Sequence, residues 1–243
     1  MVPDSLYPSF KIPDWVFLLV ALLLGGGLTA YILGVDILDP TNTALLLRGD
    51  IGVHYLGWAF FRYEEWTFPI GSISDFLYPQ GANVGYTDSI PLMAILMKPF
   101  HSILHSDFQY IGWYLLICQL LQVWTAWLLL GAVGIKNQWA RFIGTLFFSV
   151  APIWYFRWVH PALCSHYVLL GSLWVYMGSR DADRYRPWIW RQILLLTVSA
   201  YTHPYLGAMT LAIAVTWCIR LWRVDKYWKG WQTLLAMLGA AGI

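Results

Sequence analysis

Charged residues are scarce in this sequence, and the motifs of several large enzyme classes are missing. Only 12% of the 243 residues are charged, and 59% are hydrophobic. Soluble domains carry roughly 25% charged residues. The sequence has no phosphate-binding glycine loop, no dinucleotide fingerprint and no basic patch of the kind that binds nucleic acid. We therefore expect an integral membrane protein with no nucleic-acid partner.

Cysteine is also rare, and its spacing argues against two further kinds of site. The three cysteines, Cys118, Cys164 and Cys218, lie in apolar stretches, and no two form a CxxC pair. Such residues pack as small hydrophobic side chains. Among the six histidines, only His101 and His105 have the i, i+4 spacing of a helical ligand pair, and two ligands do not make a metal centre.

Long apolar runs and aromatic residues are abundant. Aromatics reach 18% of the chain, with 16 Trp and 15 Tyr, and such side chains favour membrane–water interfaces. A bilayer core requires about 20 apolar residues in a helix. Candidate spans cover residues 15–34, 109–133, 139–156, 162–177, 188–202, 204–222 and 230–243. The pattern predicts an all-α, polytopic transmembrane helix bundle of about seven spans, with a long first loop at 35–108 that holds juxtamembrane helices.

The two ends of the chain carry their own expectations. Residues 1–15 lack a basic stretch followed by a short apolar run and a small-residue cleavage site, so the first span is expected to be a retained anchor. The last apolar segment is still apolar at Ile243, and a helix ending in hydrocarbon leaves polar groups unsatisfied. We expect one transmembrane module over 1–243, with a C-terminal remainder missing.

The distribution of charge predicts the orientation. Loops at 134–141, 180–191 and 220–229 hold ten of the fifteen basic residues, whereas 35–108 holds three basic and eight acidic residues. Since cytoplasmic loops are rich in Lys and Arg, the N-terminus is expected in the cytoplasm and 35–108 outside. Residues 90–104 then cannot cross, and they lie on the outer surface or dip in and return. All six histidines fall on the outer side: His54, His101, His105, His160, His166 and His203.

The first candidate site lies in a predicted helix at 51–65, which follows a shorter predicted helix starting at Pro40 and ending at Gly49. Asp50, His54 and Trp58 share one face of this helix. A carboxylate beside aromatic rings suits a sugar, and Asp50 is a candidate general base. Asp50 as a helix cap is an equally good interpretation.

The remaining candidates are polar residues near span ends on the predicted outer side. Asp88 precedes Pro91 and is either a catalytic acid or a cap, and His203 precedes Pro204 as a ligand or a turn cap. An arginine and two histidines suit a phosphate, although an arginine there also suits lipid headgroups. A lysine inside an apolar helix requires water or an anion. The candidate binding residues are His54, Trp58, Arg62, Lys98, Arg157, His160, His166 and His203.

Three stretches carry a family resemblance: "RGDIGVHYLGWAFFR", "NVGYTDSIPLMAILMKPF" and "FFSVAPIWYFRWVHPALCSHYVLLGSLWVY". The order of the segments resembles that of the GT-C superfamily of integral membrane glycosyltransferases. This order is one inner anchor, a long outer loop with an early acid, a proline-containing helix start and then short-looped spans. The sequence looks most like bacterial GT-C-like membrane proteins of unassigned substrate. The resemblance covers roughly residues 15–222.

The resemblance implies a sugar transfer from a polyprenyl-phosphate donor to a glycan or lipid acceptor, on the extracytoplasmic face of the bacterial inner membrane. By motif position, Asp50 corresponds to the family's first-loop carboxylate, a general base or metal partner. The family's proline-rich helix start, which precedes a residue facing the donor phosphate, looks like 89–91, with Lys98 further along. One Asp stands where protein mannosyltransferases have an Asp-Glu pair, so the acceptor and a divalent metal stay open. The rival hypotheses are a lipid-glycan binder or flippase component, and a structural subunit.

Overall fold

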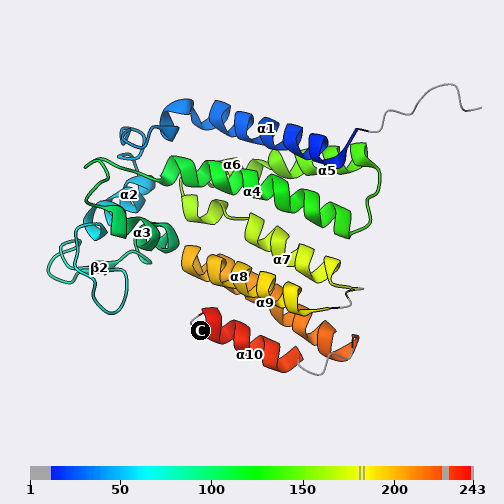
Figure 1. The fold of residues 1–243 in the computed structure, drawn as a ribbon. Helices are drawn as coiled ribbons and strands as arrows, with labels where there is room; N and C mark the ends of the chain where they lie inside the picture. Colours follow the sequence, from blue (N-terminus) through cyan, green and yellow to red (C-terminus); the bar gives the residue numbers. More distant parts are fainter. Residues whose placement is uncertain (1–11, 181, 183, 226–229, 242–243) are drawn as a thin grey trace, which may run out of the picture.

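The computed structural model describes residues 12–180, 182, 184–225 and 230–241. Apart from one small hairpin, the regular structure of this part is helical (Figure 1). The α-helices are α1 Asp14–Leu33, α2 Asp50–Phe61, α3 Pro91–Met97, α4 Ile111–Ala132, α5 Gln138–Ser149, α6 Pro152–Phe156, α7 Tyr167–Gly178, α8 Arg186–Thr202, α9 Pro204–Arg223 and α10 Gly230–Ala241. The 3₁₀-helices are η1 Val35–Leu38, η2 Lys98–Phe100 and η3 Pro161–Cys164. Strands β1 Ser72–Ile73 and β2 Ala82–Asn83 pair antiparallel, with Ser72 opposite Asn83.

Three helices in the described residues are long and apolar enough to cross a membrane. They are α1, α4 and α9, with 20, 22 and 20 residues. This confirms the helical fold class and supports a membrane protein. The shorter helices α5, α7, α8 and α10 have 12, 12, 17 and 12 residues. The structure therefore establishes three candidate spans rather than the seven that the sequence predicts.

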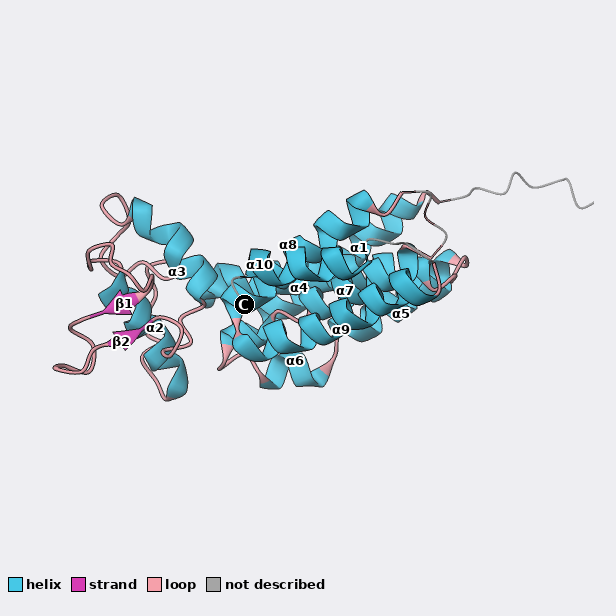
Figure 2. Cartoon of the chain, turned by 90° about the horizontal axis from the view of Figure 1, so that it is seen from below, coloured by secondary structure: helices cyan, strands magenta, loops and turns pink. Residues whose placement is uncertain are grey.

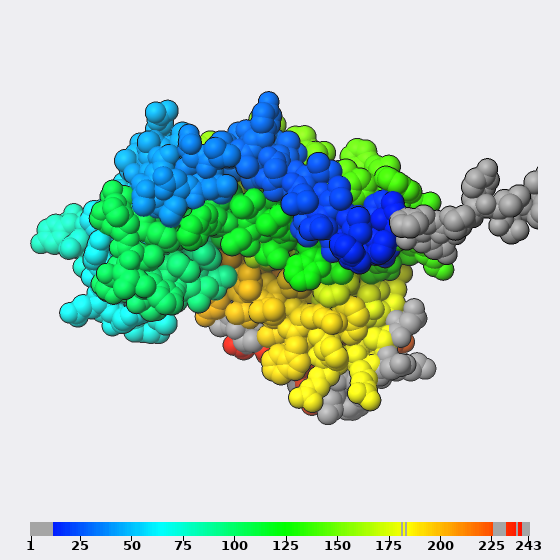
Figure 3. All heavy atoms as spheres, turned by 45° about the horizontal axis from the view of Figure 1, so that its top comes forward, coloured from blue at the N-terminus to red at the C-terminus, as the bar shows by residue number. Residues whose placement is uncertain are grey.

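The long helices lie side by side in one bundle, and residues 35–110 form a lobe at one of its ends. Helix α4 packs against α1, α5 and α7, and α8 packs against α9 and α10. Figure 2 shows β1, β2 and α2 grouped beyond the helix ends. In Figure 3, α1 lies along the outside of the bundle, and the lobe projects beside its far end.

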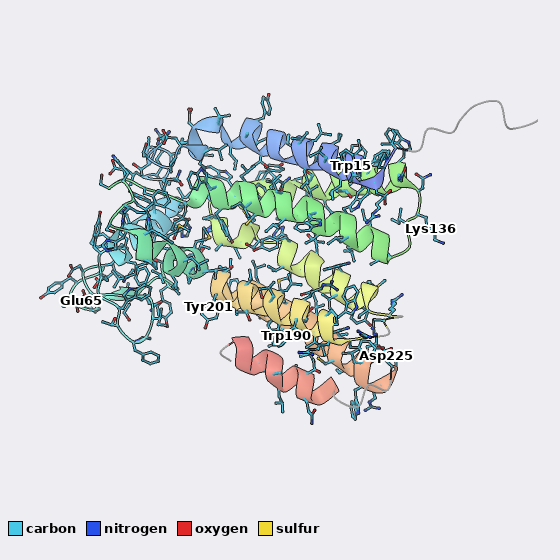
Figure 4. The ribbon with its side chains drawn as sticks, in the orientation of Figure 1. Trp15, Glu65, Lys136, Trp190, Tyr201 and Asp225 are labelled. Carbon is cyan, nitrogen blue, oxygen red and sulfur yellow. The ribbon has the colours of Figure 1, made fainter. Side chains whose placement is uncertain are left out.

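Basic loops and the acidic lobe occupy opposite ends of the bundle, as the charge pattern predicts. Figure 4 places Lys136 and Asp225 at one end, and Glu65 and Tyr201 at the other. The α4–α5 and α7–α8 connections both lie at the Lys136 end (Figure 1). Lys226 and Lys229, which belong to the same predicted basic set, lie outside the described residues, as do Asp181 and Asp183.

The predicted helix at 40–49 is wrong, because polar side chains close turns there instead. The Asp39 carboxylate accepts from the Thr41 amide at 2.9 Å and from the Thr41 hydroxyl at 2.8 Å. The Asn42 side chain accepts from the Ala44 amide at 3.1 Å. Short polar side chains that bond nearby amides in this way compete with helix formation.

The predicted span at 139–156 is broken, because α5 ends at Ser149 and α6 restarts at Pro152. A helix end inside an apolar bundle leaves carbonyl groups that need donors. Two glutamines of α4 supply them: Gln119 donates to the Ser149 carbonyl at 2.8 Å, and Gln122 donates to the Phe148 carbonyl at 2.7 Å. The break is therefore satisfied from a neighbouring helix.

Candidate functional site

One acid and three histidines converge at the lobe end of the bundle. His54, Asp88 and His160 have ligand-type atoms that all lie within 4.8 Å of one another. His203 Nε2 lies 3.7 Å from Asp88 Oδ1, and His54 Nδ1 lies 3.9 Å from Asp88 Oδ2. The four residues come from α2, the loop before α3, the loop before η3 and the α8–α9 junction. We call them the Asp88 cluster.

Helix α2 contacts the turn that carries Asp88, and a glycine permits this contact. A Cβ atom on Gly57 would lie 2.1 Å from Thr87 Oγ1 and 2.2 Å from Ser89 Oγ. One turn earlier on the same helix, His54 Nδ1 lies 2.9 Å from the Thr87 carbonyl oxygen. Gly57 thus sets the distance between His54 and Asp88, since any side chain there would push the turn away.

The backbone at Asp88 is held in a conformation that few residues adopt. Asp88 has φ 52° and Ile90 has φ 51°. Aspartate visits this left-handed region at modest cost, but a β-branched isoleucine does so only under constraint. The constraint comes from Ser89, whose carbonyl accepts from the Tyr110 hydroxyl and whose hydroxyl bonds Thr87 at 2.7 Å. Strain of this kind concentrates at functional sites.

Burial changes the protonation of the cluster. The pKa of Asp88 is raised to about 6, because desolvation disfavours its charge, while His160 lowers it in part. The Asp88 side chain keeps 20% of its surface exposed. The pKa of His203 is lowered by burial and by the neighbouring His160 and His54. A carboxylate with a pKa near 6 is ionised at neutral pH and takes up a proton readily, as a general base must.

The hydrogen-bond partners of two histidines decide what the cluster can bind. His203 Nδ1 accepts from the Tyr205 amide at 3.2 Å, so the neutral ring carries its proton on Nε2, which faces Asp88. The nitrogens of His54 lie 2.9 Å from the Thr87 carbonyl oxygen and 3.1 Å from that of Val159. Carbonyl oxygens only accept hydrogen bonds.

This pattern does not fit a divalent metal. A metal ligand must present a lone pair to the ion, whereas His203 presents an N–H to Asp88 and both nitrogens of His54 point at carbonyl oxygens. Only Asp88 and His160 remain as donors, and that is fewer than a zinc site uses. The divalent metal left open by the sequence therefore finds no complete ligand set in this cluster.

An open groove is lined by chain neighbours of the cluster rather than by the cluster residues themselves. It has a volume of about 600 Å³, and its lining includes Gly85, Tyr86 and Pro204. Tyr86 lies two residues before Asp88 and is 92% exposed, and Pro204 directly follows His203. A groove with an exposed aromatic ring and polar backbone suits a hydroxylated ligand such as a sugar.

Asp50 is not among the residues that lie beside Asp88, although it precedes His54 by one turn of α2. It is the exposed first residue of α2, and Gly49 occupies the cap position without a side-chain hydrogen bond. No hydrogen bond or ion pair joins its carboxylate to another residue of the described ranges. The capping interpretation of Asp50 is therefore wrong, and its role as general base stays a prediction.

Three predicted binding residues lie instead in the core of the lobe. Trp58 is 1% exposed and donates to a backbone carbonyl. Arg62, also 1% exposed, donates to four backbone carbonyls within 101–106. Lys98 is 2% exposed, with Nζ 3.8 Å from the Phe61 ring centroid. These side chains hold the lobe together and do not reach the Asp88 cluster.

Arg157 and His166 lie on the segment that also holds His160, and Arg157 carries the positive charge there. Arg157 is exposed and forms no ion pair in the part of the chain that the structure describes. An unpaired guanidinium here is available to an anion.

The sequence did not indicate the residues that position the cluster, which are Gly57, Thr87, Ser89 and Tyr110. One observation pointed to Gly57: a glycine inside a helix costs about 1 kcal/mol and usually has a packing reason. The others become visible only when α2, α4 and the Asp88 turn are brought together.

Comparisons with known proteins place the chain in a family without an assigned activity. A family model described as a domain of unknown function, DUF6311, matches residues 22–243. Neither the curated proteins nor the solved structures contain a match. Since the match covers nearly the whole chain, the protein belongs to the DUF6311 family.

Proposed function

We propose that this protein is a GT-C-type membrane glycosyltransferase that uses a polyprenyl-phosphate-linked sugar. The supporting observation is the Asp88 cluster, where a carboxylate with a raised pKa lies among three histidines. Its chain neighbours Tyr86 and Pro204 line an open groove. The cluster is at the end of the bundle opposite the basic loops, which is where the orientation rule places the extracytoplasmic face.

In this proposal the shorter helices cross the membrane together with the three long ones. A 12-residue helix covers only about 18 Å, less than the roughly 30 Å of a bilayer core. Helix α5 gains length from α6, and α7 gains it from η3, because each pair follows on in the chain. With seven crossings and the basic loops on the inner side, the N-terminus lies on the cytoplasmic side of a bacterial inner membrane.

The chemistry follows from Asp88. An acceptor hydroxyl attacks the anomeric carbon of the donor sugar while the Asp88 carboxylate takes the hydroxyl proton. The bond between the anomeric carbon and the phosphate oxygen breaks, its electron pair leaves with polyprenyl phosphate, and the anomeric configuration inverts. His203 and His54 flank the carboxylate, with ring nitrogens 3.7 and 3.9 Å from its oxygens.

The leaving phosphate requires a positive partner, and the exposed Arg157 supplies one at the same end. Guanidinium groups pair bidentately with phosphate oxygens and stabilise charge as it develops. Polyprenyl phosphate is stable as an anion, so no strong general acid is needed. The lipid tail of the donor lies against the spans.

The assignment of the base to Asp88 rather than Asp50 is tested by a matched pair of substitutions. Membrane vesicles containing the full chain are supplied with a panel of radiolabelled polyprenyl-phosphate hexoses and pentoses, and released polyprenyl phosphate is measured. Asp88→Asn is expected to lose roughly 10²- to 10⁴-fold in turnover, the usual share of a general base, while binding of the donor persists. Asp50→Asn is expected to stay within about twofold of wild type, because its exposed carboxylate contributes no comparable base.

Turnover of Asp88→Asn at the wild-type rate would show that the base is elsewhere, and loss in Asp50→Asn alone would return that role to Asp50. Donor binding by wild type without release of polyprenyl phosphate would favour a lipid-glycan carrier. Absence of binding for every donor in the panel would favour a structural subunit.

A further inference from the structure

We infer that the bundle holds a second ligand site, for one anionic phospholipid, on the surface formed by α4, α7 and α8. Its lipid phosphate pairs with Arg191. This inference rests on the membrane placement in the proposed function, but it does not depend on the transfer chemistry.

The site is an apolar groove of about 550 Å³ between three helices. Helix α4 contributes Leu121 and Leu128, and α8 contributes Leu194, which is 63% exposed. The α7 wall runs from Tyr167 to Trp174, about 10 Å along the helix axis. The size and apolar walls suit part of one acyl chain.

Arg191 is the charged residue of the groove lining. Its guanidinium carbon lies 4.6 Å from the Trp188 ring centroid and 5.2 Å from that of Trp174. Within 12–180, 182, 184–225 and 230–241, no carboxylate pairs with it. Rings stabilise the charge but leave the N–H donors without strong acceptors. Arg191 is exposed near the start of α8, so these donors are accessible to an anion.

The position of Arg191 selects the kind of anion. Helix α8 starts at Arg186, at the end that holds Lys136 and Asp225, and Arg191 lies five residues further, about 7.5 Å along the axis. Under the proposed orientation this is the cytoplasmic leaflet, whose anionic lipids are attracted to basic protein ends. A phosphate in the headgroup region meets the guanidinium bidentately while its acyl chain fills the groove.

The test is a competition between two lipids with identical acyl chains. Full-length protein in nonionic detergent is mixed with equal amounts of phosphatidylglycerol and phosphatidylcholine, and bound lipid is counted by native mass spectrometry. Wild type is expected to prefer phosphatidylglycerol by roughly tenfold, the factor that a charge-assisted hydrogen bond provides. Arg191→Gln is expected to remove the preference, and Arg186→Gln, outside the groove at the same end, is expected to keep it.

Two further arms separate a lipid site from simpler alternatives. Leu194→Trp fills the groove from its exposed side, and it is expected to lower bound phosphatidylglycerol although Arg191 remains. Soluble glycerol phosphate is expected to compete poorly because it lacks the acyl chain. Equal loss in the Arg186 and Arg191 variants, or full competition by glycerol phosphate, overturns the proposal. The Asp88→Asn protein should bind phosphatidylglycerol normally, so an absence of transferase activity does not affect this result.

Discussion

Two carboxylates lie beside basic side chains at opposite ends of the bundle, and the two pairings differ in kind. At the basic end, the Arg220 guanidinium donates to Asp225 Oδ2 at 3.0 and 3.3 Å. Arg220 also donates to Ser179 at 3.0 Å and to the Tyr176 carbonyl. At the lobe end, Asp88 has no partner as close, with its two histidine nitrogens at 3.7 and 3.9 Å.

The difference separates polar groups that hold the fold together from polar groups that remain available to a ligand. The Arg220 guanidinium donates short hydrogen bonds within the protein. The side chains of Arg220 and Asp225 are nearly buried, at 9% and 11% exposed. Such a network fixes geometry and has little capacity for a ligand. Asp88 combines long contacts, a strained backbone and a raised pKa, which lower stability and are typical of a site kept for chemistry.

The largest effect on stability is expected from breaking the Arg220–Asp225 ion pair. Arg220→Met leaves Asp225 buried without its partner, which typically costs about 3–5 kcal/mol. Thermal unfolding in detergent measures the loss. Arg223→Met is the control, because Arg223 is exposed on the same turn and only stacks on Trp222. Equal stability of the two variants would mean that the pair at 220 and 225 is not structural.

At Asp88, a substitution is expected to raise the stability of the protein rather than lower it. Its folded pKa of about 6 exceeds the ordinary 3.8, so its stability contribution is present below pH 3.8 and is lost as pH rises to 6. Asp88→Asn removes the buried charge, and asparagine tolerates φ 52°. It should therefore stabilise the protein at pH 8 by on the order of 2 kcal/mol, and by much less at pH near 4. Thermal midpoints at the two pH values check this, and destabilisation at both would contradict it.

A smaller loss of stability is expected inside the bundle, where buried polar side chains satisfy backbone groups. Gln122→Met removes the donor to the Phe148 carbonyl at the broken end of α5, a loss on the order of 1 kcal/mol. Activity per folded molecule should not change. Gln232→Met, at an exposed position of α10, is the matched control and should be neutral in the same unfolding measurement.

The smallest effect concerns the pH dependence of transfer. Transfer should fall as pH drops through about 6, because Asp88 then holds a proton and no longer acts as base. His160 lowers the Asp88 pKa, so His160→Gln should move this acidic limb to higher pH by a fraction of a unit. His105→Gln, in an exposed turn, serves as the control. A pH limb unaffected by His160 would remove that residue from the site.

The sequence by itself determined the helical class, the membrane character and the separation of the two ends. These properties follow from local quantities: the length of apolar runs and the number of Lys and Arg in each loop. It also predicted one end for Asp88, His54, His160 and His203, because the charge rule assigns residues 35–108 and the turns after two predicted spans to the same side. The transferase resemblance remains a proposal.

Only the tertiary structure decided which carboxylate enters the cluster. Asp50 and Asp88 look alike in sequence, each an acid before a helix, yet one is exposed and the other is enclosed by segments more than 100 residues apart. The helix break after Ser149 likewise depends on hydrogen-bond donors from α4, and the position of the Asp88 turn depends on Gly57. Burial, and with it the pKa of a carboxylate, is set by what packs around a residue, and neighbours in space cannot be read from neighbours in the chain.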